Sequence, residues 1–287
     1  TWVAGMAASN GLRKKMHELT RGNPHQPTST DKAELIEVFK KRVDSGGMVM
    51  ANQEIYLRQP LGTEFADIVF PASGWGEHDF ARANGERRIR LYSGFYDAPG
   101  ESKPDWWIAG QLGQRMGFEG FDWKESNDVF EEAARFTRGS RKDYYPLVWL
   151  ARKKGMKGHE LLRSYGTDGI QGPIVYQDGA LEGTKRLHDS TRKLPLAGPQ
   201  GPTVFKKKLT GFKTQSGKAN FMKSPWSLWD DYYNYVKPEE DELWVLNGRI
   251  NEIWQSMFDD SMRRPYIMRR FPENFLEINP EDAKRLG

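Results

Sequence analysis

The sequence predicts an α/β fold built on a parallel sheet, followed by a second domain. Within the first 70 residues, apolar runs of strand length alternate with patterns of helical spacing, the order expected of a parallel sheet. After residue 205 the apolar pattern changes to a period of two. We therefore place residues 1–205 in an α/β domain, with a helical and loop excursion over about 120–205, and residues 206–287 in the second domain.

The N-terminal strands and helices are predicted from apolar spacing and from end signals. Three short apolar runs predict strands at residues 2–6, 48–51 and 68–70. A basic helix is expected to end near Thr20. Asp31 is expected to cap a second helix, with Glu34 completing a capping box and Gly46-Gly47 ending the helix.

A tight turn and a series of helices follow. Asn84-Gly85 predicts the turn, and alternating arginines and apolar residues predict a strand directly after it. Four helices are then expected, at residues 104–116, at 126–136 with Ser126 as cap, and two within 141–165.

The second domain is expected to open with a hairpin around Ser216-Gly217. The apolar run at residues 243–246 predicts a buried strand. The last helix should start with Asn279 as cap and Pro280 as its first residue.

Composition excludes several kinds of site. The chain has no cysteine, which excludes disulfides, thiolate zinc sites and cysteine-bound iron–sulfur clusters within its 287 residues. The sequence has no apolar run of about 18 residues that could span a membrane. A net charge of +4 is weak support for a nucleic-acid partner, and none is expected.

The first candidate site is the turn after the predicted strand at 243–246. Side-chain amides recur there at four-residue spacing, which places them on one helical face: Asn247, Asn251 and Gln255. Amides both donate and accept, as the edge of a heterocycle requires, and Arg249 offers a fork for phosphate. Gly248 lets the main chain approach a ligand. The alternative is a surface turn with solvated amides and Trp254 in the core.

The second candidate site is the charged stretch after residue 75. Four arginines lie close together around Glu86: Arg82, Arg87, Arg88 and Arg90. Such a cluster suits an anionic cofactor, and the alternative is a charged hairpin facing water. No metal ligand is assigned, because the adjacent Glu77-His78-Asp79 would rarely converge on one ion.

The third candidate site lies at the ends of predicted strands. Ligands bind beyond the carboxyl ends of strands in parallel α/β sheets. Small, amide or acidic residues follow two of the apolar runs: Gly5, Asn10, Asn52, Gln53 and Glu54. The sequence has neither a G-x-G-x-x-G fingerprint nor a phosphate-binding G-x-x-x-x-G-K-[ST] loop.

Several stretches in fixed order carry a family resemblance: "ADIVFPA", "NGERRIRLY", "NGRINEIWQS" and "EINPEDAKRLG". Together they resemble the C-terminal part of molybdopterin oxidoreductases of the dimethyl-sulfoxide-reductase superfamily. Within it, the chain is most similar to the large catalytic subunits of arsenite oxidases and iodate reductases. The resemblance implies that the second domain begins a β-barrel of the double-psi type. It also implies that the chain is a piece of a longer protein, inactive alone.

The resemblance implies a bis(molybdopterin guanine dinucleotide) molybdenum cofactor. An iron–sulfur cluster is expected only in a preceding N-terminal part. The resemblance implies cofactor-binding roles, near the pterin, its phosphates or a guanosine, for Gly5, Asn10, Gln53, Glu86, Arg87, Asn247, Gly248, Arg249, Asn251, Trp254 and Gln255. It identifies no catalytic residue in this chain.

The resemblance also implies a two-electron oxo transfer, with oxidation of arsenite to arsenate expected first. Reduction of iodate or another small oxyanion is the alternative. The implied partners are a small Rieske-type iron–sulfur subunit and a soluble electron carrier, and the implied location is the periplasm. A non-catalytic α/β binding module is the alternative of another class, and a basic RNA-binding protein is a third.

Overall fold

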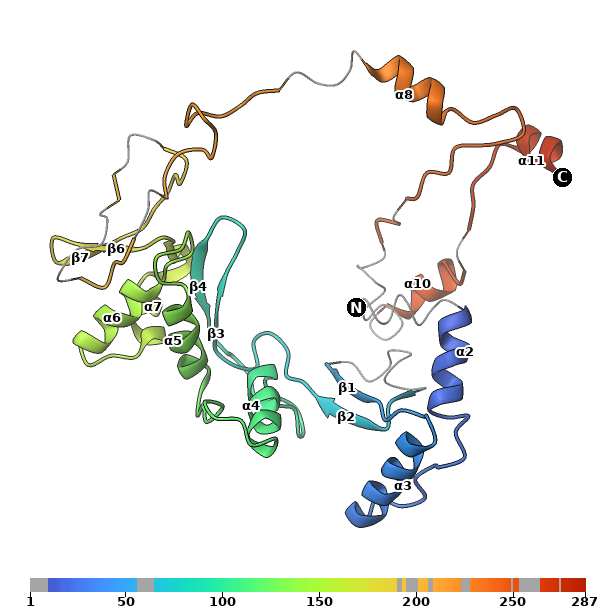
Figure 1. Cartoon of the computed structure of the whole chain (residues 1–287), viewed down its shortest axis with the longest axis horizontal. Helices are drawn as coiled ribbons and strands as arrows, with labels where there is room; N and C mark the ends of the chain where they lie inside the picture. The colour runs from blue at the N-terminus through green and yellow to red at the C-terminus, as the bar shows by residue number, and fades with distance from the viewer. Residues whose placement is uncertain are drawn as a thin grey trace. The chain divides into compact units, whose positions relative to one another are not determined.

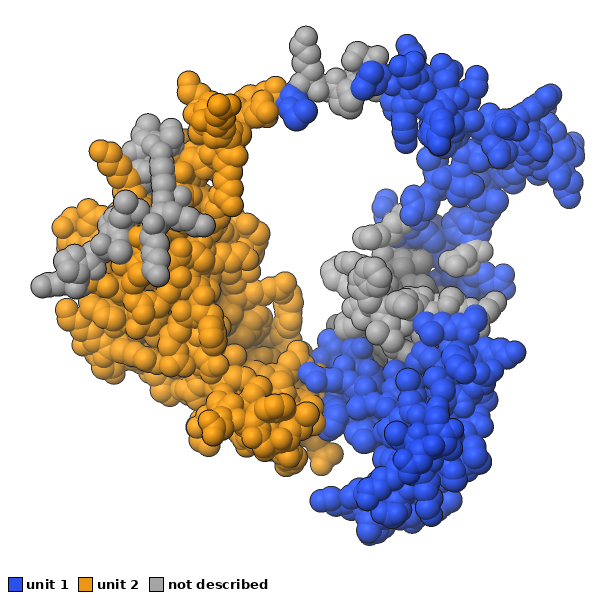
Figure 2. All heavy atoms as spheres, in the orientation of Figure 1, with its two compact units in different colours: residues 1–70, 222–287 blue, residues 71–221 orange. Residues whose placement is uncertain are grey.

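The computed structural model describes residues 10–55, 65–189, 193–194, 201–205, 209–222, 228–248, 250–252, 264–273 and 275–287. These residues form a mixed α/β structure with short strands and helices (Figure 1). The chain divides into two compact units: unit 1 is residues 1–70 with 222–287, and unit 2 is residues 71–221 (Figure 2). The α/β class is confirmed, whereas the barrel and the domain boundary near residue 205 stay predictions.

Unit 1 contains two strands and five helices among its described residues. They are α2 (Asn10–Leu19), α3 (Lys32–Asp44), β1 (Ala51–Glu54), β2 (Ile68–Pro71, whose last residue belongs to unit 2), α8 (Trp229–Val236), α10 (Pro265–Arg270) and α11 (Pro280–Leu286).

Unit 2 contains the other described strands and helices. They are β3 (Phe80–Ala83), β4 (Arg88–Tyr92), α4 (Asp105–Arg115), α5 (Ser126–Phe136), α6 (Tyr145–Lys153), α7 (Gly158–Arg163), a 3₁₀ turn (Gly166–Asp168), β5 (Ile170–Gln171), β6 (Val175–Gln177) and β7 (Ala180–Glu182).

Helix α3 begins where the sequence predicts, but without a reciprocal capping box. The Asp31 carboxylate accepts hydrogen bonds from the main-chain N–H groups of Ala33 and Glu34. The main-chain N–H of Asp31 donates to the Ser29 hydroxyl, so it does not need the Glu34 side chain. Glu34 instead accepts from the hydroxyls of Thr28 and Ser29. The cap is therefore confirmed and its second half is corrected.

The strand predicted at residues 48–51 forms three residues later, as β1. The main chain at 48–50 is engaged elsewhere: the N–H of Met48 donates to the Leu19 carbonyl, and the N–H of Met50 donates to the Asp67 carboxylate. β1 pairs with β2, which forms where the sequence predicts a strand. The strand predicted at residues 2–6 lies outside the described residues.

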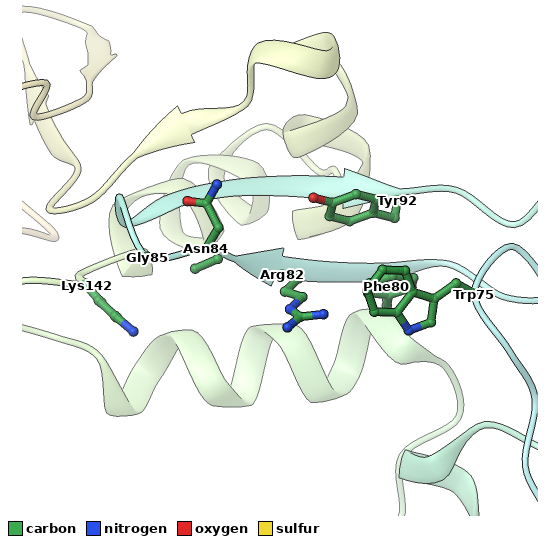
Figure 3. A pocket seen from close by; sticks show the side chains of 8 residues that line it. Trp75, Phe80, Arg82, Asn84, Gly85, Tyr92 and Lys142 are labelled. Carbon is green, nitrogen blue, oxygen red and sulfur yellow. The ribbon is translucent and has the colours of Figure 1, made fainter. Parts of the chain in front are cut away.

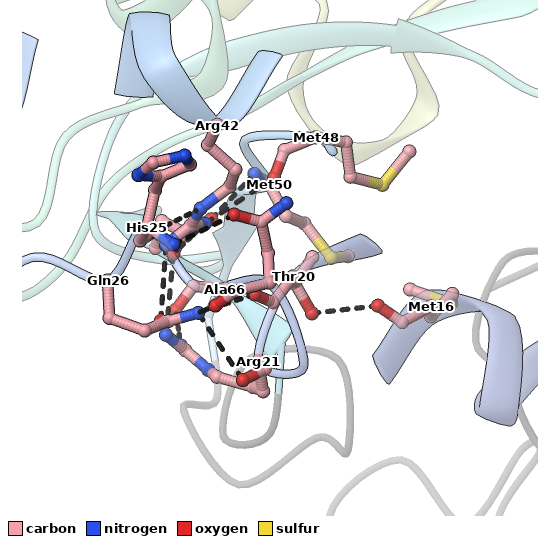
Figure 4. A network of polar contacts seen from close by, with 11 residues as sticks. Met16, Thr20, Arg21, His25, Gln26, Arg42, Met48, Met50 and Ala66 are labelled. Atoms are coloured by element: carbon pink, nitrogen blue, oxygen red, sulfur yellow. Dashed lines mark hydrogen bonds and ion pairs between the residues drawn. The ribbon is translucent and has the colours of Figure 1, made fainter. Parts of the chain in front are cut away.

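A buried ion pair holds α3 to the start of β2 (Figure 4). The side chains of Arg42 and Asp67 are fully buried, with 2.7 Å between guanidinium nitrogen and carboxylate oxygen. Arg42 also donates to the carbonyl of His25 and to the side chain of Gln26. Arg21 adds a second cation, 3.4 Å from the Asp67 carboxylate. These contacts satisfy the two buried charges, and a buried charge left without its partner is costly.

The core of unit 2 packs around a three-stranded sheet in the order β3-β4-β5. Both ladders are antiparallel, with Phe80 opposite Tyr92 and Ile89 opposite Ile170. β6 and β7 form a separate antiparallel pair. The parallel sheet expected of the α/β domain is therefore not found in these ladders. β3 and β4, like β6 and β7, are joined by short turns, and strands joined in this way run in opposite directions.

Helices α5 and α7 pack against β3 and β4 respectively, and both contact α6. The shared core includes Ile89, Phe130, Leu147, Val148, Leu162 and Ile174. The helices predicted at 104–116 and within 141–165 are confirmed as α4, α6 and α7. Helix α5 is capped by Glu125 rather than Ser126, because the main-chain N–H groups of Lys124 and Glu125 both donate to the Asp128 carboxylate.

The C-terminal part departs most from the predicted strands. Residues 242–248 form no strand, and Val245 and Leu246 are 77% and 88% exposed. No described segment forms a β ladder with residues 242–248. A strand needs such a neighbour, because its main-chain N–H and C=O groups must be hydrogen-bonded. Around Ser216-Gly217 the turn forms, with a bond from the N–H of Phe212 to the Gly217 carbonyl, but residues 209–222 contain no strand.

The last helix confirms its predicted start. Asn279 caps α11 by accepting the N–H of Glu281 at 2.8 Å, and Pro280 is the first helical residue. Of the helices that the structure describes, none is both long and apolar enough to cross a membrane.

Replacing Arg42 by methionine should lower the free energy of unfolding by about 3–5 kcal/mol, because it leaves the Asp67 carboxylate buried and without its closest cation. Urea unfolding of wild-type and variant protein measures the difference. Lys40→Met is the matched control: Lys40 pairs with Glu37 at the surface of the same helix, so its loss should cost less than about 1 kcal/mol. Equal effects of the two variants would contradict this account.

Candidate functional site

The turn between β3 and β4 places a non-glycine residue in the left-handed conformation. The N–H of Arg87 donates to the Asn84 carbonyl at 3.0 Å, and the N–H of Asn84 donates to the Arg88 carbonyl at 3.2 Å. This is the pattern of a hairpin loop in which a left-handed residue follows a tight turn. The turn predicted at Asn84-Gly85 is confirmed, but the left-handed residue is Arg87, with a φ of 66°.

Four hydrogen bonds hold Arg87 in that conformation. Its guanidinium donates to the carbonyls of Gly172 at 2.8 Å and Thr184 at 3.1 Å. Its own carbonyl accepts the N–H of Gly172 at 2.8 Å and the hydroxyl of Tyr144 at 3.0 Å. A left-handed non-glycine residue costs on the order of 1–3 kcal/mol, and it persists only when its surroundings fix it. The guanidinium of Arg87 is therefore used to anchor the hairpin.

Burial shifts the pKa values of both groups in this anchor. Burial lowers the pKa of Arg87, and the positive charge of Arg141 acts in the same direction. Burial raises the pKa of Tyr144 to about 12. Tyr144 therefore keeps its proton at neutral pH and can donate its hydrogen bond to the Arg87 carbonyl.

Glu86 neutralises two of the four arginines in the cluster. Its carboxylate lies 3.0 Å from Arg88 and 3.4 Å from Arg90, and it also accepts the side-chain amide of Asn84. The hydrogen bond from Asn84 and the charge-assisted bond from Arg88 lower the pKa of Glu86. Arg88 and Arg90 also donate to main-chain carbonyls of the 3₁₀ turn. The Arg82 guanidinium differs from the other three, because it has neither a hydrogen bond nor an ion pair to another described residue, whereas Arg87 is bonded to two main-chain carbonyls.

A pocket of about 370 Å³ lies along the hairpin (Figure 3). Aromatic, cationic and amide side chains line it: Trp75, Phe80, Arg82, Ala83, Asn84, Gly85, Tyr92 and Lys142. The Arg82 guanidinium lies 5.2 Å from the centre of the Trp75 ring. Phe80 stacks on Tyr92 across the two strands, with ring centres 5.0 Å apart. We call this the hairpin pocket.

The chemistry of the hairpin pocket suits a flat anionic ligand. Neither Arg82 nor Lys142 has a hydrogen-bond or ion-pair partner for its charged group within the part of the chain that the structure describes. A bound anion would therefore not have to break an existing ion pair. The aromatic rings offer faces for a planar group, and Asn84 offers an amide.

The hairpin pocket was only partly recognisable in the sequence. Phe80, Arg82 and Asn84 follow one another at intervals of two residues, and strand geometry places residues with this spacing on one face. Tyr92 joins this set because the hairpin register puts it opposite Phe80. Lys142 is distant in sequence, and only the packing of unit 2 brings it to the pocket.

A buried acid fixes the turn that carries Lys142. The Asp143 carboxylate accepts the N–H of Gly139 at 2.7 Å and the N–H of Tyr145 at 3.0 Å. Burial raises the pKa of Asp143 to about 6, against the opposing effect of these hydrogen bonds. The carboxylate ties the two ends of the turn together at the start of α6.

The other predicted site residues belong to unit 1, apart from the hairpin pair already described. Gln53 lies in β1 and is exposed, as are Asn247, Gly248 and Asn251 in irregular segments. Asn10 is the first residue of α2. Gly5, Arg249, Trp254 and Gln255 lie outside the described residues, as do residues 253–263, over which the amide face was expected to continue. The cofactor roles given to these residues stay predictions.

The acidic residues beside His78 are used within the fold. Glu77 accepts the N–H of Gly74, and Asp79 pairs with Arg163 at 2.7 Å. The His78 ring nitrogen lies 3.0 Å from the Ser73 hydroxyl. Over the residues for which the structure gives positions, no three His, Cys, Asp or Glu side chains are grouped as metal ligands.

Comparison with known proteins finds a family whose sequence model matches part of this chain. Residues 31–115 match the molybdopterin oxidoreductase family. The chain is 54% identical to the iodate reductase subunit IdrA of Denitromonas iodatirespirans over 294 residues, which cover 100% of this chain and 32% of the relative. The corresponding protein of Pseudomonas sp. (strain SCT) is 53% identical over 294 residues, covering 100% of this chain and 33% of that relative.

A more distant relative is named for a different activity. The arsenite oxidase subunit AioA of Herminiimonas arsenicoxydans is 29% identical over 276 residues, covering 89% of this chain and 30% of the relative. The chain thus spans about a third of the length of the curated relatives that it matches.

Asp143 should make the free energy of unfolding depend on pH, and the Asp143→Asn variant should lack this dependence. Its folded pKa of about 6 lies above its ordinary value of 3.8, so the folded state binds more protons between these values. The contribution of Asp143 to the free energy of unfolding therefore falls as pH rises through this window. The stability of Asp143→Asn relative to wild type should increase by on the order of 2–3 kcal/mol from about pH 4 to pH 7. Urea unfolding across this range measures the difference, and parallel pH profiles would refute it.

Proposed function

Because the chain belongs to the molybdopterin oxidoreductase family, we propose that it is part of the catalytic subunit of a molybdenum enzyme that reduces iodate. The observation that carries this proposal is 54% identity over the whole chain to a protein named as an iodate reductase subunit. The arsenite oxidase subunit is only 29% identical. Arsenite oxidation, which the sequence resemblance put first, therefore takes second place.

The hairpin pocket fits part of the proposed cofactor. A molybdenum–pterin cofactor carries phosphate charge and a planar ring system, and when bound it supplies a two-electron change at molybdenum coupled to oxygen transfer. We assign Arg82 and Lys142 to its negative charge, because neither is neutralised by another described residue. Trp75 and Tyr92 offer ring faces for its planar part. The guanine dinucleotide form belongs to the same proposal.

Glu86 and Arg87 support the pocket in this proposal. Glu86 neutralises Arg88 and Arg90, so the anion faces Arg82 rather than a crowded row of cations. Arg87 fixes the turn through its bonds to Gly172 and Thr184. Four residues of unit 1 are further proposed cofactor contacts, because their amide or main-chain groups can donate and accept hydrogen bonds: Gln53, Asn247, Gly248 and Asn251.

Turnover belongs to the complete protein in this proposal. In each two-electron step one oxygen leaves iodate as water, two protons are consumed, and iodine accepts the electron pair. The relatives are named as subunits, which supports a partner that delivers the electrons. A Rieske-type iron–sulfur subunit, a soluble carrier and a periplasmic location stay predictions.

Two assays on the complete purified protein, loaded with its cofactor, test the proposed function. Iodate should oxidise a reduced viologen dye at least about tenfold faster than arsenite reduces an oxidised dye, a difference of about 1.4 kcal/mol in barrier. Nitrate and formate serve as comparison substrates, since other relatives are named nitrate reductase and formate dehydrogenase. Protein purified from cells grown with tungstate in place of molybdate is the control for whether the activity requires molybdenum.

Faster turnover of arsenite than of iodate would overturn the choice of substrate. If the protein retained molybdenum and pterin but turned over none of these substrates, the non-catalytic binding module would be the better account.

A further inference from the structure

A second pocket of unit 2 is lined in part by the turn that carries Lys142. It has a volume of about 530 Å³. Two segments far apart in sequence line it: Gly139, Ser140 and Arg141 from the turn before α6, and Leu209, Thr210, Gly211, Phe212 and Lys213. We call it the 139–213 pocket. None of these residues belongs to the hairpin pocket.

The charge of the 139–213 pocket is positive and not neutralised from within. Arg141 and Lys213 both line it, and neither charged group has a partner among the residues that the structure describes. None of the described residues that line the pocket is acidic. The nearby Asp143 uses its carboxylate oxygens on the N–H groups of Gly139 and Tyr145. An anion entering the pocket would therefore meet two cations without displacing a carboxylate.

Hydroxyl groups complete the polar lining. The Ser140 oxygen accepts the N–H of Lys142 at 3.1 Å, which leaves its own proton able to donate to a ligand. Thr210 is buried, with 7% of its surface exposed. Cations combined with hydroxyl donors are the usual partners of phosphate oxygens.

The walls of the 139–213 pocket are fixed by contacts within the fold. Gly139 has a φ of 73°, and an added Cβ would collide with the Val204 carbonyl. The Gly211 carbonyl lies 3.0 Å from the His188 ring nitrogen. The His188 ring stacks on Phe212 with centres 4.4 Å apart and planes 13° from parallel. Phe212 is thus held as a rigid aromatic wall that is 39% exposed.

We propose that the 139–213 pocket binds a phosphate monoester that carries a small flat organic group. The two cations and the Ser140 hydroxyl would bind the phosphate, and Phe212 would contact the organic group. The volume falls in the range of about 300–1,000 Å³ typical of sites for organic ligands, well beyond the needs of a bare ion. This site is separate from the proposed redox function and does not depend on it.

Calorimetric titration of the complete protein with phenyl phosphate and with inorganic phosphate tests the proposal. Phenyl phosphate should bind about tenfold more tightly, because only it reaches the Phe212 ring. Arg141→Gln and Lys213→Gln should each weaken its binding about tenfold, and Arg141→Lys should restore part of the loss. Lys154→Gln is the matched control, since it removes the same charge from the exposed end of α6 and should change nothing.

Several results would overturn the assignment. They are equal affinity for the two ligands, binding unaffected by either pocket variant, or binding abolished by Lys142→Gln but not by Arg141→Gln. The last result would place the ligand in the hairpin pocket. Circular dichroism of each variant checks that the fold is kept. Because the titration needs no turnover, its failure is distinguishable from failure of the proposed iodate reduction.

Discussion

The hydrogen bonds of Arg87 are the constraint on which the arrangement of unit 2 depends. A residue of this size in the left-handed region is unfavourable, so the hairpin keeps its shape only while the guanidinium and carbonyl of Arg87 stay bonded to Gly172, Thr184 and Tyr144. These bonds join the hairpin to the start of α6, to Gly172 directly after β5 and to Thr184 after β7. The face that carries Arg82 inherits its position from them.

The charges of the chain fall into two groups with different physical roles. Some are satisfied inside the fold, such as the buried pair of Arg42 and Asp67 and the cluster around Glu86. Others line a pocket with no counter-charge among the described residues: Arg82, Lys142, Arg141 and Lys213. Satisfied pairs explain how the units hold together. The unsatisfied cations are where an anionic ligand gains most, and both pockets proposed as binding sites are built on them.

Local features of the structure were predictable from the sequence, whereas features set by packing were not. Asp31 and Asn279 cap their helices as expected, because a cap depends on a few neighbouring residues. The apolar run at 243–246 was expected to be a buried strand, yet strand formation depends on a ladder partner elsewhere. In the candidate site, the arginine cluster was visible in the sequence. Its division into bonded Arg87, paired Arg88 and uncompensated Arg82 required the fold.

The cofactor content of an Arg82→Gln variant tests the central claim most directly. Arg82 is exposed, and its guanidinium lies over the Trp75 ring without a hydrogen bond or ion pair to another described residue, so its replacement should leave the fold intact. The account predicts that the complete protein purified with this change carries about tenfold less molybdenum and pterin per polypeptide, since one charge-assisted contact is lost. Arg115→Gln, an exposed arginine bonded within its own helix, should keep the wild-type load. A full load in the Arg82 variant would contradict the account.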